Sequence, residues 1–101
     1  MPISVDINGE IGRISLAGKF DFAVQDDFRR VISEALDNNT FKDIQVDLAE
    51  VTFMDSSAIR LLLQLNMNAS VIGKSVTLIN CRDTIREIFA IGGFDSVLTI
   101  R

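Results

Sequence analysis

Alternating apolar and polar residues near the start of the chain predict a β-hairpin. Residues 3–7 and 11–16 each place apolar side chains at every second position, and Asn8-Gly9 supplies a turn between them. After Gly18 the apolar spacing changes to that of a helix, which we expect to end at Asn38-Asn39. The residues that form its apolar stripe are Phe28, Val31, Ile32, Ala35 and Leu36.

The rest of the chain alternates between predicted strands and helices. Strands are expected at residues 44–48, 75–79 and 97–100, and a helix at 55–72 closed by Gly73 in a left-handed conformation. Another helix around residues 85–89 is expected to stop at Gly92-Gly93. The order β-β-α-β-α-β-α-β predicts an α/β fold with a mixed, mostly parallel sheet, in a single domain spanning residues 1–101.

Composition narrows the classes of partner. Hydrophobic residues make up 48% of the chain and charged residues 24%, as in globular proteins. The net charge of −4, without any run of Lys or Arg, argues against nucleic acid as a partner. Cys81 is the single cysteine, and the chain shows neither a signal-peptide pattern nor a membrane-spanning apolar run. These features predict a cytoplasmic protein that does not contact membranes.

The residue inventory also argues against an enzyme. There is no histidine, so the usual general base and metal ligand are missing, and the glycines form no phosphate-binding motif. Asp21, Asp26 and Asp27 lie close enough to suggest a carboxylate metal site, but an acidic first helical turn explains them more simply. We expect no metal, no cofactor and no small-molecule substrate.

The helix start at Asp55-Ser56-Ser57 permits two interpretations. Asp55 suits the N-cap position, and simple capping would account for all three polar residues. Alternatively, one of the serines accepts a phosphoryl group, whose negative charge is best tolerated at a helix N-terminus. The local sequence alone favours the capping interpretation.

A polar stripe on the same helix predicts a surface for a partner. At about 100° per residue, Ser57, Arg60, Gln64 and Asn68 fall on one face that should meet solvent. Leu61 falls inside its margin, which makes it either an apolar part of the docking face or an incidental exposed leucine. Met67 and Val71 lie on the other flank of the polar stripe. Asn66 falls on the apolar side of the helix and has no predicted role. Cys81 is interpreted as a small core residue.

Several short segments resemble the STAS family of anti-sigma-factor antagonists. They are Val46-Asp47-Leu48, Val51-Thr52-Phe53-Met54 and above all Asp55-Ser56-Ser57-Ala58-Ile59. By position, the resemblance implies Ser57 as the phosphoacceptor with Ser56 as its competitor, and Asp55 and Asp21 as supporting residues. Family members commonly carry glycine where this chain has Ala58, a change that favours helix.

The resemblance also implies a partner-switching function. A serine kinase or anti-sigma factor of the histidine-kinase-like ATPase fold would bind the unmodified protein and phosphorylate it, and a PP2C-type phosphatase would reverse the modification. Phosphorylation of Ser57 would release the partner and thereby regulate transcription or another output. The alternative is a STAS module that binds its partner constitutively and is never phosphorylated. The oligomeric state is left open by the sequence.

Overall fold

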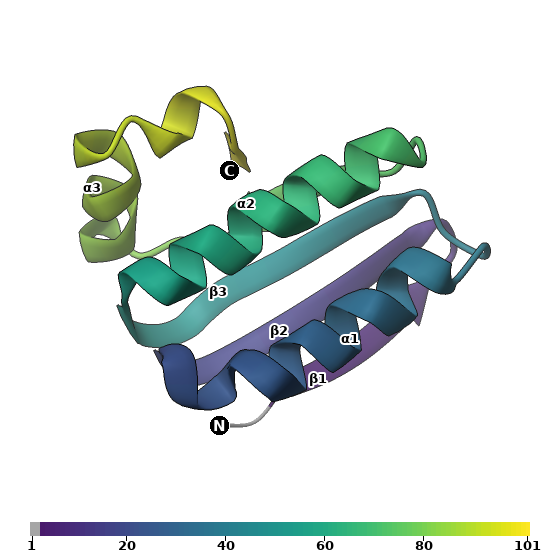
Figure 1. The fold of residues 1–101 in the computed structure, drawn as a ribbon, viewed down its shortest axis with the longest axis horizontal. Coiled ribbons are helices and arrows are strands. Elements are labelled where there is room, and N and C mark those ends of the chain that lie inside the picture. Colours follow the sequence, from purple (N-terminus) through teal and green to yellow (C-terminus); the bar gives the residue numbers. More distant parts are fainter. Residues whose placement is uncertain (1–2) are drawn as a thin grey trace.

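The computed structural model describes residues 3–101 and shows the predicted order of elements (Figure 1). The strands are β1 (Ile3–Asn8), β2 (Ile11–Phe20), β3 (Asp43–Met54), β4 (Ser75–Ile79) and β5 (Thr99–Ile100). The helices are α1 (Gln25–Asp37), α2 (Ser56–Val71) and α3 (Asp83–Ile91), with short 3-10 turns η1 (Phe22–Val24) and η2 (Phe94–Ser96). The predicted β-β-α-β-α-β-α-β order is confirmed.

The strands form one five-stranded sheet in the order β1-β2-β3-β4-β5. β1 runs antiparallel to β2, and all other neighbours are parallel, so the predicted mixed, mostly parallel sheet is confirmed. Right-handed crossovers that keep stepping in one direction place successive helices on the same face of a sheet. Accordingly, α1 and α2 lie side by side over one face (Figure 1).

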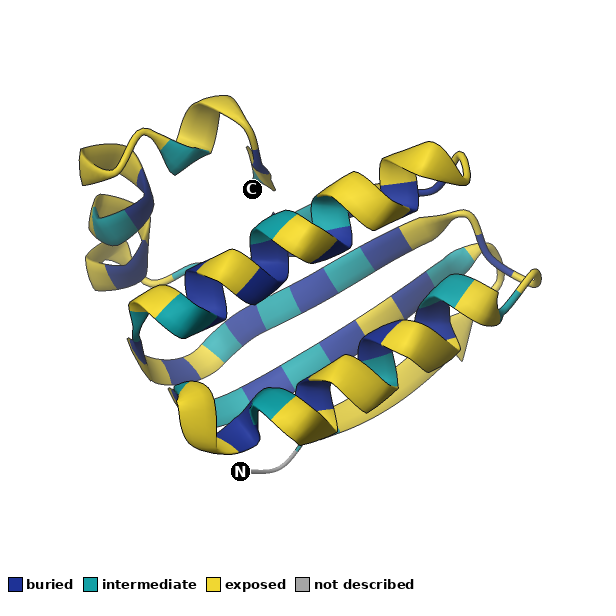
Figure 2. Cartoon of the chain, viewed as in Figure 1, coloured by how far each residue is buried: buried dark blue, intermediate teal, exposed yellow. Residues whose placement is uncertain are grey.

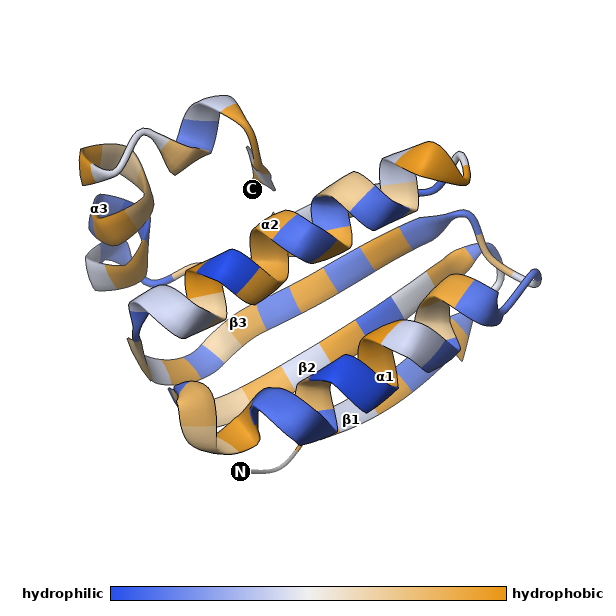
Figure 3. Cartoon of the chain, in the orientation of Figure 1, coloured by the Kyte–Doolittle hydropathy of each residue, from blue (hydrophilic) through white to orange (hydrophobic). Residues whose placement is uncertain are grey.

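The core lies between the helices and that face of the sheet. Along β2 and β3 buried residues alternate with more exposed ones (Figure 2), and apolar residues alternate with polar ones in the same register (Figure 3). The buried strand residues on the helix side are Ile14, Leu16, Ile44, Val46, Leu48, Val76 and Leu78. The period of two in these strands therefore points one apolar row at α1 and α2.

Four boundaries differ clearly from the sequence-based predictions. β2 and β3 continue to Phe20 and Met54, past register shifts that interrupt the strict alternation on which the prediction relied. The last strand is shorter than predicted, because Val97 caps η2 instead of pairing with β4. The hairpin turn is Gly9-Glu10, since Asn8 pairs with Ile11 and Gly9 takes the positive φ of 63°.

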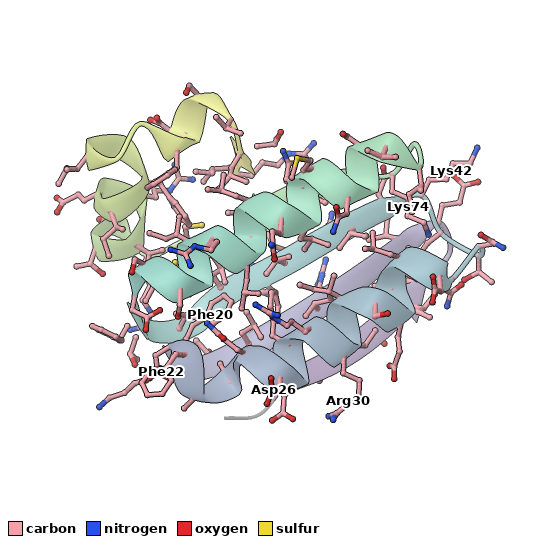
Figure 4. All side chains as sticks on the ribbon, in the orientation of Figure 1. Phe20, Phe22, Asp26, Arg30, Lys42 and Lys74 are labelled. Atoms are coloured by element: carbon pink, nitrogen blue, oxygen red, sulfur yellow. The ribbon has the colours of Figure 1, made fainter. Side chains whose placement is uncertain are left out.

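Lys74 is a buried charged residue that the sequence analysis missed. Its Nζ donates to the carbonyl oxygens of Phe41 at 2.9 Å, Ala35 at 3.4 Å and Asn38, and lies 4.5 Å from the centre of the Phe41 ring. These carbonyls belong to the last turns of α1 and the loop after it, where a helix end carries partial negative charge. One ammonium group thus closes the end of α1 (Figure 4).

The Phe41 ring also packs against Gly12. A Cβ atom at Gly12 would come within 2.6 Å of the Phe41 ring, so only glycine leaves room for the ring at this position of β2. Phe41 is 2% exposed and bridges β2 to the Lys74 ammonium group. The loop after α1 is therefore fixed to the sheet by the packing of the Phe41 ring on Gly12 and by its contact with the Lys74 ammonium group.

We expect Lys74→Met to lower the free energy of unfolding by about 2–4 kcal/mol, because it leaves buried carbonyl oxygens without a donor. Urea denaturation monitored by circular dichroism measures the effect. Lys42→Met is the matched control, since Lys42 is exposed and its loss should change stability by no more than about 0.5 kcal/mol. Equal stability of the two variants would contradict the capping role of Lys74.

Candidate functional site

The turns that follow β2 and β3 meet at the carboxyl end of the parallel strands. Phe20 and Met54 are the last paired residues of the two strands, and the Asp55 amide donates to the Phe20 carbonyl at 3.3 Å. Because the two strands are parallel, the chain leaves both of them at the same end of the sheet, the carboxyl end, where ligands bind in open α/β folds. The segments around Asp21 and Asp55 are therefore brought together.

Asp55 links these two turns through its carboxylate. Oδ1 accepts hydrogen bonds from the Ser57 hydroxyl at 2.6 Å and the Ala58 amide at 3.0 Å, and Oδ2 accepts one from the Phe22 amide at 3.2 Å. The predicted N-cap of α2 is thus confirmed. The hydrogen bond from Ser57 is the main cause that lowers the pKa of Asp55 below 3.8; burial opposes it, and the backbone amides of Ala58, Phe22 and Ser57 lower the pKa further.

The two serines of the motif occupy different environments. Ser57 is half-buried and its hydroxyl is held by Asp55, whereas Ser56 is exposed on the first turn of α2. The Ser57 oxygen therefore has a fixed position close to the free amides of the helix N-terminus. Such a position would stabilise the negative charge of a phosphoryl group on this oxygen.

Asp21 caps the 3-10 turn that directly follows it. Its Oδ1 accepts a hydrogen bond from the Ala23 amide at 3.1 Å and caps η1. The next residue, Phe22, is tied by its amide to Asp55 while its ring is 73% exposed. Asp21 thus shapes the loop beside Asp55. The exposed ring of Phe22 is an apolar neighbour of Asp55 that the sequence did not single out.

The predicted polar stripe of α2 is largely confirmed. Arg60, Gln64 and Asn68 are exposed, and Met67 and Val71 are exposed beside them. Together with Ser57 they form a surface that starts at the helix N-terminus and runs along the whole of α2. We refer to the residues Ser57, Arg60, Gln64 and Asn68 as the α2 stripe.

The prediction that Leu61 belongs to an exposed docking face is wrong. Leu61 is 2% exposed and forms part of the core. The side of α2 that carries it faces α1, and with Ile32, Leu36 and Leu65 it lines the floor of a groove between the two helices. A helical wheel drawn for one helix contains no information about a second helix beside it, which is why the sequence placed Leu61 on the surface.

The groove between α1 and α2 borders the α2 stripe. It encloses about 220 Å³, and its polar lining consists of Arg29 and Ser33 from α1 and Gln64 and Asn68 from α2. The apolar stripe of α1 predicted that this helix packs on the core. Only the packing of α1 beside α2 reveals that Arg29 and Ser33 adjoin the candidate surface.

Three further side chains take no part in this surface. Asn66 is half-buried, and its side-chain amide donates to the Val97 carbonyl at 3.5 Å. The part of α2 that carries Asn66 therefore faces the C-terminal segment. Cys81 is half-buried, and burial is the main cause that raises the pKa of its thiol, which makes it a poor nucleophile. Asp27 pairs with Arg30 at 3.3 Å in the first turns of α1.

Within the part of the chain that the structure describes, two kinds of feature are missing. No helix is both long enough and apolar enough to cross a membrane. Among the same residues, no three acidic or cysteine side chains cluster as metal ligands would.

Comparison with known proteins identifies the family. The model of a protein family described as "Mlab, STAS domain" matches residues 3–99, which is nearly the whole chain. The chain belongs to the STAS-domain family. A STAS-domain containing protein of Pseudomonas aeruginosa (strain UCBPP-PA14) is 33% identical over 93 residues, covering 92% of this chain and 90% of the relative.

Solved structures show the same fold at lower sequence identity. The anti-sigma factor antagonist SpoIIAA in its unphosphorylated form is 23% identical and superposes with a TM-score of 0.77 over 99% of this chain and 87% of its own. The phosphorylated form of SpoIIAA from Bacillus gives 0.76 at 23% identity, over 99% and 91%. An anti-sigma factor antagonist from Mycobacterium paratuberculosis gives 0.87 at 14% identity, over 98% and 83%. The fold of this STAS domain is therefore that of anti-sigma-factor antagonists.

Replacing Asp55 by Asn should destabilise the protein by about 0.3–1 kcal/mol at neutral pH, because Asn still caps α2 but lacks the negative charge that the helix N-terminus favours. Because the folded pKa of Asp55 lies below 3.8, the stabilisation is complete above that pH and disappears as the pH falls through the folded pKa. Urea denaturation of both proteins should show a constant difference at neutral pH that shrinks in acid.

Asp95→Asn is the control for this experiment, since Asp95 is exposed on η2. A difference between wild type and Asp55→Asn that stays the same at every pH would show that shape, and not charge, accounts for the cap.

Proposed function

We propose that this STAS domain is a partner-switching regulator controlled by phosphorylation of Ser57. The unmodified protein binds a serine kinase or anti-sigma factor of the histidine-kinase-like ATPase fold, and the phosphorylated protein releases it. The supporting observation is the hydroxyl of Ser57, which is held by Asp55 at the N-terminus of α2 and begins an exposed polar stripe. A phosphoryl group on Ser57 would therefore lie inside any partner interface that covers the α2 stripe.

A phosphoryl group on Ser57 is compatible with the fold. It adds about −1.5 to −2 charges at the end of α2 where the helix dipole favours them by about 0.3–1 kcal/mol. It also replaces the Ser57–Asp55 hydrogen bond with repulsion between two anions. The solved structures of SpoIIAA in phosphorylated and unphosphorylated form superpose about equally well on this chain, which supports a switch that changes the surface without refolding the domain.

The loss of partner binding follows from desolvation. A neutral hydroxyl is easily accommodated in a close interface, whereas a phosphate there must lose water, and its repulsion from the neighbouring Asp55 carboxylate grows once water no longer screens it. A cost of about 3 kcal/mol lowers affinity more than a hundredfold. In this scheme a PP2C-type phosphatase restores binding, and the domain acts in the cytoplasm as a regulatory protein without enzymatic activity of its own.

Two alternatives remain close to this proposal. Ser56 is the more exposed of the two hydroxyls and competes for the phosphate. A constitutive binding module would use Ser57 only as part of the α2 cap, through the same hydrogen bond to Asp55. Site-resolved detection of phosphate separates all three possibilities.

Protein recovered from its native cells should carry phosphate on Ser57 in an amount that varies with growth conditions. Intact mass spectrometry and peptide fragmentation measure it. The phosphate should vanish in Ser57→Ala and persist in Ser56→Ala, which is the matched control. Phosphate that follows Ser56 would reassign the site, and the absence of phosphate under every condition would favour the constitutive module.

Ser57→Asp should weaken binding of the kinase partner by about a hundredfold or more, while Ser57→Ala keeps near-native affinity. Titration calorimetry with the partner captured by the Ala variant provides the comparison. Ser56→Asp adds the same charge one residue earlier and should have a much smaller effect, because Ser56 lies off the α2 stripe. Equal weakening by both Asp variants would indicate a general charge effect and not a switch at Ser57.

A further inference from the structure

The two edges of the sheet are protected very differently. β5, at one edge, is only two residues long (Thr99–Ile100). β1, at the other, is a regular strand of six residues, Ile3–Asn8, and is exposed over most of its length. Natural proteins usually blunt such an edge with proline, lysine, a bulge or a covering segment. Within Ile3–Asn8, Asp6 is the single charged residue, so β1 is open to pairing.

The register of the hairpin determines which backbone groups of β1 point outward. Asn8 and Ile11 flank a two-residue turn and form a hydrogen-bonded pair, so the antiparallel pattern alternates from there. Ile3, Val5 and Ile7 consequently direct their backbone N–H and C=O groups away from β2. The side chains of Val5 and Ile7 are also about half exposed, at 45% and 48%.

We propose that β1 pairs antiparallel with β1 of a second copy of this chain, across a two-fold axis at Val5. This register sets Ile3 opposite Ile7 and Ser4 opposite Asp6, and it lets all three outward-pointing residues exchange hydrogen bonds. Shifting it by one pair in one direction places Asp6 opposite Asp6, which is repulsive, and in the other direction loses backbone bonds. The result is one continuous sheet through both copies.

Charges on α1 fit the same axis. Arg30 lies beside Ile3 in one surface depression, which is also lined by Asp27, its partner within the chain at 3.3 Å. Glu34 lies beside Val5 and Ile7 in the next depression. Since the axis brings Ile3 of one copy opposite Ile7 of the other, Arg30 of each copy faces Glu34 of the other. Arg30 points away from the α2 side of α1 (Figure 4), toward the edge that would be joined.

The proposed dimer leaves the α2 stripe accessible. α1 lies between the β1 edge and α2 (Figure 1), so a second copy on β1 does not cover Ser57 or Arg60. A strand pairing of this length gives a small interface, and we expect the association to depend on protein concentration. The dimer does not depend on the proposed phosphorylation, and its test needs no other protein.

Sedimentation velocity over a concentration series should show a monomer–dimer equilibrium for the wild type. Val5→Asp places two carboxylates at the axis and should weaken dimerisation at least about tenfold. Val97→Asp is the matched control, because Val97 is exposed at 58% and remote from β1, and it should dimerise like the wild type. A wild type that is monomeric at every concentration, or a dimer unaffected by Val5→Asp, would overturn the proposal.

Exchanging the charges of Arg30 and Glu34 tests the register of the dimer without altering the sequence of β1. Arg30→Glu alone and Glu34→Arg alone should each dimerise poorly, because each copy then meets like charges across the axis. An equal mixture of the two variants should form heterodimers, since both cross-axis pairs become complementary. The loss of the Arg30–Asp27 pair within the Arg30→Glu chain is the same in the mixture as in that variant alone, so it does not affect the comparison. Failure of the mixture to associate better than its components, with both folded by circular dichroism, would exclude this arrangement.

Disulfide trapping locates the axis. In a Cys81→Ser background, Val5→Cys should link two copies under mild oxidation, because a hydrogen-bonded antiparallel pair separates Cα atoms by about 5.5 Å, within disulfide range. Asp6→Cys should not link to itself in this register. Efficient linkage through Asp6→Cys and not through Val5→Cys would contradict the proposed axis.

Discussion

From β2 to β5, each new strand pairs in parallel with the strand before it, always in the same direction across the sheet. The positions of the helices follow from this constraint. With right-handed crossovers, stepping in one direction puts α1 and α2 side by side on one face of the sheet. The parallel direction of β2 and β3 also brings their carboxyl ends, and the loops after them, to the same end of the sheet. The candidate site, the groove beside it and the buried side of α2 all result from this arrangement.

Two charged side chains fix the helices at opposite ends. The Asp55 carboxylate binds amides at the start of α2 and of η1, and the Lys74 ammonium group binds carbonyls at the end of α1. Each charge has the sign that its helix end favours. Asp55 differs from Lys74 in that it also binds the hydroxyl proposed to receive phosphate. The same contact therefore contributes to stability and makes the helix start responsive to modification.

The surfaces used for the two proposed interactions are separate. The α2 stripe begins at Ser57 and would engage a regulatory partner, while the β1 edge would engage a second copy on the far side of α1. A partner on the stripe meets polar side chains and a modifiable hydroxyl, which suits reversible binding. The edge offers backbone hydrogen bonds and apolar side chains, which suits association of identical chains.

The sequence by itself determined the order of elements, most helix ends, the N-cap at Asp55 and the exposed stripe. These depend on the period of the apolar residues and on local hydrogen bonding, which neighbouring residues control. Only the tertiary structure decided that Leu61 is buried and that Lys74 lies in the core, because both depend on α1, which is distant in sequence. The open edge of β1 likewise follows from the strand order, a property of the whole sheet and not of any one segment.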